Sequence, residues 1–222
     1  MAVRVVTDSS ADLPSDIANN ADITVIPCNV VIDDVSYKDG VDITPDEFYQ
    51  RLATSSRLPT TAQPSVADFQ AVYQNLLDEG HTVVSIHVSG KLSGTVNAAE
   101  QARAALSDPA AVEIVDSQLA SISLGLVSLA ASKLAEEGVT IAQLAQQVRD
   151  QLPRTDCMFA LDTLEYLQKG GRIGRAQAFV GAILSVKPIL KLQDGEAYPL
   201  ERSRNMDRAL RRLAELVRGQ AP

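Results

Sequence analysis

The chain has 222 residues, of which 45% are hydrophobic, and a formal net charge of −8. This length supports one large or two small hydrophobic cores, and the negative charge argues against a general nucleic-acid binder. No segment approaches the roughly 20 consecutive apolar residues of a membrane span, and no charged-then-apolar leader precedes the first strand-like segment, so we expect a soluble, cytoplasmic protein.

Short β-branched segments alternate with helical patterns in the first part of the chain. Strands are predicted over residues 3–7, 23–27, 82–88 and 112–115, with a hairpin made by residues 29–32 and 35–37. Helices are predicted from Pro14, from Thr44 to Ala53, from Ser65 to Asp78, up to Leu106, from Leu119 to Glu137 and from Thr140 to Leu152. This order predicts an α/β domain over residues 1–152, with an open, mostly parallel sheet and helices on both faces.

The pattern changes after residue 152. Strands are predicted over residues 157–161, 186–192 and 196–201, short helices over 163–169 and 175–184, and a final basic helix from Asn205. We interpret residues 153–222 as a smaller α+β domain. Phe179, Val180, Ile183 and Leu184 fall on one helical face, which is typical of a core, although the aliphatic composition is also compatible with a narrow tunnel.

Charge is distributed unevenly along the sequence. Residues 169–222 contain 11 Lys and Arg against 5 Asp and Glu, whereas the preceding 168 residues contain 9 against 23. Two interpretations are equally supported: a surface for a partner or phosphate, or a solvated helix face. Five of the eleven basic residues fall largely on the final helix: Arg204, Arg208, Arg211, Arg212 and Arg218.

Short polar residues follow the predicted strands, where open α/β sheets bind their ligands. Three segments follow strands in this way: Thr7-Asp8-Ser9-Ser10, Ser89 to Thr95, and Asp116-Ser117. Thr60-Thr61 joins them at the entry to the helix that begins at Ser65. The sharpest is Ser93-Gly94-Thr95, because Gly94 permits close backbone approach and the following helix directs N–H groups at a carboxylate or phosphate. An ordinary helix cap explains the same turn.

Catalysis and metal binding are less well supported. The Gly-x-Ser-x-Gly motif is absent, and His87 is expected to point into the sheet layer, so a hydrolytic serine lacks a base. Asp8 and Asp116 could act as acid and base, but such aspartates more often accept backbone N–H bonds in turns. Cys28, Cys157 and the two histidines have the spacing of neither a disulfide framework nor a metal site.

Several segments in order resemble the DegV family. They are residues 7–14 (TDSSADLP), 61–65 (TAQPS), 92–95 (LSGT), 115–117 (VDS), 164–173 (LEYLQKGGRI) and 186–190 (VKPIL), which together extend over nearly the whole chain. The resemblance implies a two-domain DegV-like fold that binds a long-chain fatty acid such as palmitate, with no catalysis, metal or cofactor of its own. It also implies a partner, a fatty acid kinase that makes an acyl phosphate for phospholipid metabolism.

The resemblance also implies residue roles. Thr61 and Ser93 would bind the carboxylate, with the Gly94 N–H assisting and Arg172 near the head group, while the tail would lie in a tunnel between the domains. Ser9, Asp116 and Ser117 complete the expected ligand-binding set, and Arg202 is the expected kinase-docking residue. Family members usually continue with a His-Thr-Gly-Pro-Gly-like segment, so the second domain is expected to be truncated.

Two other functions remain open from the residues. One is an acyl-ester hydrolase or phosphotransferase that uses Asp8, Ser93 and Asp116. The other is a small-anion sensor or interaction protein that binds acetate or phosphate as well as it binds a long chain.

Overall fold

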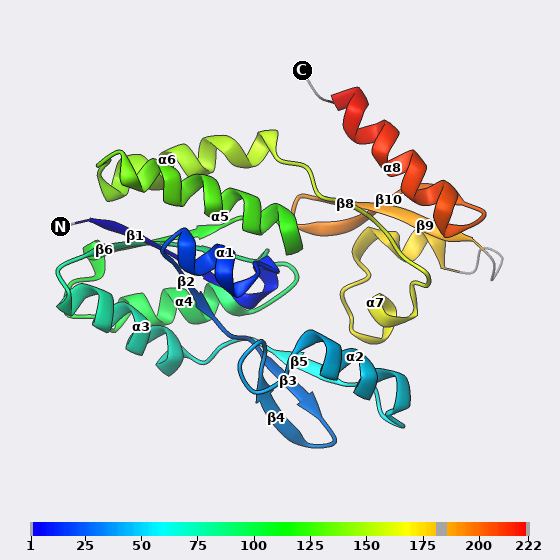
Figure 1. The fold of residues 1–222 in the computed structure, drawn as a ribbon, viewed down its shortest axis with the longest axis horizontal. Helices are drawn as coiled ribbons and strands as arrows, with labels where there is room; N and C mark the ends of the chain where they lie inside the picture. The colour runs from blue at the N-terminus through cyan, green and yellow to red at the C-terminus, as the bar shows by residue number, and fades with distance from the viewer. Residues whose placement is uncertain (1, 181–185, 221–222) are drawn as a thin grey trace. The chain divides into compact units, whose positions relative to one another are not determined.

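The structure is a computed structural model that describes residues 2–180 and 186–220. The chain divides into two compact units, Met1–Thr155 and Asp156–Pro222. Each unit has its own sheet or sheets and its own hydrophobic core (Figure 1). None of the described helices is both long and apolar enough to cross a membrane.

The first unit is built on a four-stranded sheet in which every pairing is parallel. Its strands, in spatial order, are β2 (Ile23–Ile26), β1 (Val3–Asp8), β6 (Thr82–His87) and β7 (Val112–Asp116). Asp8 pairs with Ile26 and His87 with Asp116, so the carboxyl ends of the strands lie along one edge. These buried strands consist largely of valine and isoleucine, as parallel sheets do.

Helices cover both faces of this sheet (Figure 1). One face carries α3 (Val66–Asp78) and α4 (Thr95–Ala104), and the other α5 (Ser121–Glu136) and α6 (Ile141–Gln151). Phe69 and Tyr73 of α3 pack with Val6 and with alanines of α4 in the main core. Shorter helical segments occupy the connections: η1 (Ser9–Ala11), α1 (Ser15–Asn20), η2 (Pro109–Ala111) and η3 (Leu152–Arg154).

A second, antiparallel sheet lies between β2 and α3 in the chain. Its strands, in spatial order, are β4 (Val35–Lys38), β3 (Asn29–Ile32) and β5 (Thr60–Ala62), and α2 (Pro45–Thr54) follows β4. Val30, Ile32 and Ile43 form its small core, against which Tyr37 and Phe48 pack. Asp33 and Asp34 both have positive φ, as a two-residue hairpin turn that matches the strand twist requires.

The second unit contains an antiparallel three-stranded sheet in the order β10, β9, β8. Its elements are β8 (Met158–Ala160), α7 (Glu165–Lys169), η4 (Gly174–Phe179), β9 (Lys187–Gln193), β10 (Glu196–Ser203) and α8 (Met206–Gln220). Ala176, Leu190 and Ala197 form its core, with Phe159 and Phe179 packed against them.

The predicted fold class, an α/β protein with a parallel sheet between helices, is confirmed. Three local predictions were wrong. Residues 60–62 form a strand where the sequence suggested a turn, because their pairing with β3 is set by distant residues. Helix α5 begins at Ser121 and not near Leu119, since Gln118 has positive φ and Ala120 is extended.

The third error concerns the helix predicted over residues 175–184. The chain instead forms a 3₁₀ helix that ends at Phe179, and Val180 is extended. Ile183 and Leu184, expected on the same apolar face, lie outside the described residues.

Candidate functional site

The turn between β6 and α4 brings polar groups to the carboxyl edge of the parallel sheet. Ser93 and Gly94 are half-buried there, and Thr95 begins α4. Gly94 is the N-cap residue and offers no side chain, so Ser93 accepts the N–H of Thr95 at 3.3 Å and its hydroxyl lies 2.8 Å from Thr95 Oγ1. The first N–H groups of a helix lack partners within it and attract an anion. The turn thus combines a hydroxyl with a positive helix end.

The segment that contains Thr61 lies against this turn through Gln63. A Cβ on Gly94 would meet the Gln63 side chain at 3.1 Å. Thr61 itself is exposed on β5, opposite Val30, and lies two residues before Gln63. Two extended residues span roughly 7 Å, so the Thr61 hydroxyl and the Ser93 turn belong to the same region of the surface. The contact between Gln63 and Gly94 joins these two segments.

Asp116 fixes the beginning of the turn. Both of its carboxylate oxygens lie 3.2 Å from the Gly90 N–H, and Oδ1 also accepts the N–H of Gln118 at 2.9 Å. A Cβ on Gly90 would lie 2.8 Å from Asp116 Oδ2, so a side chain at position 90 would displace the Asp116 carboxylate. Asp116 therefore accepts backbone N–H bonds in the turns, as expected from the sequence, and ties the end of β7 to the β6–α4 turn.

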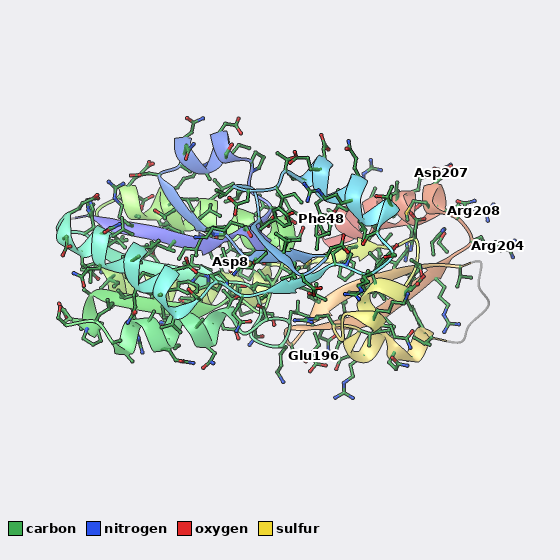
Figure 2. All side chains as sticks on the ribbon, turned by 90° about the horizontal axis from the view of Figure 1, so that it is seen from below. Asp8, Phe48, Glu196, Arg204, Asp207 and Arg208 are labelled. Carbon is green, nitrogen blue, oxygen red and sulfur yellow. The ribbon has the colours of Figure 1, made fainter. Side chains whose placement is uncertain are left out.

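Asp8 and His87 form a buried pair at the same edge. Asp8 Oδ2 lies 2.9 Å from His87 Nδ1 and accepts the Val88 N–H at 3.0 Å, while Oδ1 accepts the Ser10 N–H at 3.0 Å. Both side chains are fully buried, and Asp8 lies at the end of its strand, surrounded by side chains (Figure 2). Burial alone would raise the pKa of Asp8, but the hydrogen bond and charge interaction with His87, with the two backbone bonds, lower the pKa below its ordinary value.

The hydrogen-bond chain continues beyond His87 into the core. His87 Nε2 lies 2.6 Å from Ser85 Oγ, and the hydroxyl of Tyr73 donates to Ser85 Oγ at 2.8 Å. Burial raises the pKa of Tyr73, which keeps this phenol protonated. Every member is fully buried, so Asp8, His87 and Ser85 have the residue types of a hydrolytic triad but no access to a substrate.

The residues of the suggested hydrolase are not assembled as a catalytic group. Asp8 bonds to His87 and to backbone N–H groups, Ser93 to Thr95, and Asp116 to Gly90 and Gln118. The imidazole is directed at Ser85, so it does not serve Ser93 as a base. Among the described residues, no group of three or more His, Cys, Asp or Glu side chains is arranged to bind a metal ion.

Two further predicted site residues stabilise the backbone at this edge. Ser9 Oγ accepts the N–H of Cys28 at 3.0 Å. Ser117 is buried, and its hydroxyl donates to the His87 carbonyl at 2.6 Å and accepts the Leu119 N–H at 3.1 Å. Both hydroxyls are therefore engaged within the protein.

The two predicted arginines belong to the second unit. Arg172 follows α7 and the Gly170-Gly171 pair, where Gly171 has a φ of 73° that favours glycine. Arg202 is on β10, and its guanidinium carbon lies 4.3 Å from the ring centre of Phe179, a cation–π contact.

The basic C-terminal helix has one paired arginine and several exposed ones. Arg212 bonds to Glu201 at 2.8 Å and to Glu215 at 3.0 Å. Arg204 and Arg208 extend away from the start of α8 (Figure 2), and Arg211 and Arg218 are also exposed.

Sequence reasoning missed Gln63 and the pairing of Asp8 with His87. The signal for Gln63 was its place in the TAQPS segment beside Thr61. For His87, the signal was a polar residue ending an otherwise apolar buried strand. Neither signal predicts which residue the side chain contacts, because both contacts join segments far apart in the chain.

Fold and site together define an α/β protein whose hydroxyl-bearing turns and helix end face the carboxyl edge of a parallel sheet. The DegV family model, described as an uncharacterised protein of the DegV family, matches residues 2–222. The chain belongs to the DegV family.

Individual relatives agree with this assignment. A DegV domain-containing protein of Caldanaerobacter subterraneus is 36% identical over 216 residues, which are 97% of this chain and 76% of the relative. Among solved structures, a DegV family protein from Thermus thermophilus, described as binding fatty acid, is 38% identical with a TM-score of 0.89; the match covers 99% of this chain and 78% of that one. A stearic acid-binding protein from Eubacterium ventriosum is 27% identical with a TM-score of 0.90, covering 98% and 76%.

Proposed function

We propose that this protein binds a long-chain fatty acid and presents it to a fatty acid kinase. The observation that carries the proposal is the Ser93 turn, where a half-buried hydroxyl and the positive end of α4 lie beside the Thr61 segment. That arrangement suits a carboxylate. The fatty-acid-binding relatives from Thermus thermophilus and Eubacterium ventriosum support an acyl chain as the rest of the ligand.

In this proposal, the residues of the site have different roles. Ser93, Thr61 and the Gly94 N–H bind the carboxylate, and Arg172 acts near the head group. Ser9, Asp116 and Ser117 act through the backbone, because their oxygens already accept backbone N–H groups. Asp116 fixes the turn by accepting backbone N–H groups, and it does not bond to the carboxylate of the ligand.

Native mass spectrometry of the purified protein tests the binding. We expect a co-purified mass in the range of a C16–C18 acid, or uptake of palmitate or oleate by delipidated protein. Acetate and inorganic phosphate serve as controls for a small-anion sensor and should not compete at equal concentration. A protein that is consistently empty and takes up neither acid would contradict the proposal.

A kinase assay tests presentation. The protein loaded with palmitate, a bacterial fatty acid kinase and ATP should together yield acyl phosphate, while the protein alone should yield none. Arg202→Ala should lower the rate without changing palmitate affinity, because Arg202 is an exposed residue of β10. Arg218→Ala, on the exposed side of α8, is the matched control.

A further inference from the structure

Gln63 makes the contact that joins the β5 segment to the beginning of α4. The position that a Cβ on Gly94 would take is 3.1 Å from Gln63 Cδ, 3.1 Å from Nε2 and 3.4 Å from Oε1. At such distances, a point in the plane of the amide could not be nearly equidistant from all three atoms, because the three atoms lie within about 2.3 Å of one another. The carboxamide therefore turns its flat face to Gly94, and its N–H groups, which lie in the amide plane, are not consumed by this contact.

The backbone around Gln63 is held in place on both sides. The Gln63 carbonyl accepts from Asn29 Nδ2 at 3.2 Å, and Pro64 is buried. Ser65 and Asp68 then form a capping box at the start of α3, with the Ser65 N–H bonded to Asp68 at 3.0 Å. The Gln63 side chain, by contrast, is exposed, and its amide has no hydrogen bond to any residue that the structure describes. Its N–H groups are therefore open to solvent and to a ligand.

We propose that Gln63 is a specificity-determining residue of the head-group site, whose Nε2 donates a hydrogen bond to the ligand carboxylate bound at the Ser93 turn. This inference rests on the proposed function. Gly94 then has two purposes: its N–H faces the anion, and its lack of a side chain lets the carboxamide lie over the turn. Because the amide is neutral, it adds a donor without the desolvation cost of a buried cation.

Gln63→Glu tests the donor directly, since it replaces the NH₂ group by a charged oxygen of nearly the same size. At pH 8, this variant should bind palmitate at least about 10-fold more weakly, as expected for losing a hydrogen bond to a charged group and adding repulsion. Its affinity for hexadecanol, which has no charge, should change less than about 3-fold. Gln63→Met, which keeps the length and removes the polar atoms, should weaken palmitate binding by a smaller factor.

Gln101→Glu is the matched control, because Gln101 is exposed on α4 and the substitution makes the same change in net charge. If the unaltered protein binds neither palmitate nor oleate, the proposed function itself fails. If it binds palmitate and Gln63→Glu binds as tightly as Gln101→Glu, the role of Gln63 is overturned. Equal losses for palmitate and hexadecanol would also overturn it, since they indicate a general structural effect.

A double-mutant cycle tests the contact with Gly94. Ala at position 94 would place its Cβ 3.1 Å from the Gln63 amide and displace it, although the Gly94 φ of −76° suits alanine. Gly94→Ala should therefore weaken palmitate binding by about 5-fold or more in the presence of Gln63 and by less than about 2-fold in a Gln63→Ala background. Effects that multiply independently would contradict the proposed coupling.

Discussion

Asp8 Oδ2 lies 2.9 Å from His87 Nδ1 in the interior of the first unit, between residues separated by 79 positions in the chain. Strand pairing explains the contact. Val6 of β1 pairs with Ser85 of β6, so two residues further along each strand Asp8 and His87 lie side by side on the same face. The same carboxylate oxygen accepts the Val88 N–H, which fixes the chain just before it enters the Ser93 turn.

Replacing Asp8 by Asn should destabilise the protein strongly. In the folded protein, the charged Oδ2 of Asp8 bonds to both the His87 ring and the Val88 N–H. The side-chain amide of Asn has no charge, so the buried His87 loses its charged partner. Breaking such a pair costs about 3 kcal/mol or more. Denaturant unfolding measures the loss, and Asp16→Asn, at an exposed position in the first turn of α1, should change the free energy of unfolding by less than about 0.5 kcal/mol. Equal effects of the two substitutions would contradict this account.

The stability contributed by Asp8 should depend on pH. Its pKa is lower in the folded protein than in the unfolded chain, so its contribution is complete above the unfolded value of about 3.9 and is lost as the pH falls through that value toward the folded one. The difference in unfolding free energy between the unaltered protein and Asp8→Asn should therefore shrink as the pH falls below about pH 4. A difference that stays constant down to pH 2.5 would show that the Asp8 charge is not involved.

The head-group hypothesis predicts that Thr61→Ala and Ser93→Ala each weaken palmitate binding. Each substitution removes a hydroxyl that donates to a charged group, at roughly 1.5–3 kcal/mol. Thr60→Ala is the matched control, since Thr60 is also exposed on β5 but points to the other face of the strand. Calorimetric titration of delipidated protein gives the affinities. Unchanged affinity in the double variant Thr61→Ala/Ser93→Ala would place the carboxylate elsewhere.

Local signals in the sequence were sufficient for most of the helices and strands. The helix beginning at Ser65 was predicted from a serine followed three residues later by an aspartate, and the structure shows the reciprocal capping bonds between them. The hairpin at Asp33-Asp34 and the parallel strands followed in the same way from turn residues and β-branched runs. These features depend on residues within a few positions of one another.

Long-range features were not predictable from one sequence. Strand β5 has only three residues and exists because β3 pairs with it, and the His87 pairing depends on the register between β1 and β6. Gln63 contacts Gly94 across 31 positions, and the role that we propose for it depends on the orientation of its amide, which the sequence does not show. Residue types therefore indicated the turns that form the candidate site, whereas strand register and packing determine which side chains meet there.

Gly125 should be intolerant of any side chain. A Cβ at this position of α5 would lie 2.6 Å from the Ala11 carbonyl oxygen and 3.0 Å from Leu13 Cδ2, so the helix would have to move away from η1. In a helix interior, alanine is more favourable than glycine by about 1 kcal/mol, but overpacking typically costs about 1–3 kcal/mol. Here the contact is with a backbone atom, which cannot move aside as a side chain can. Gly125→Ala should therefore lower the thermal midpoint. Gly219→Ala, at a position of α8 with open space around it, should leave the midpoint unchanged or raise it. A higher midpoint for Gly125→Ala would mean that α5 is not packed this closely against η1.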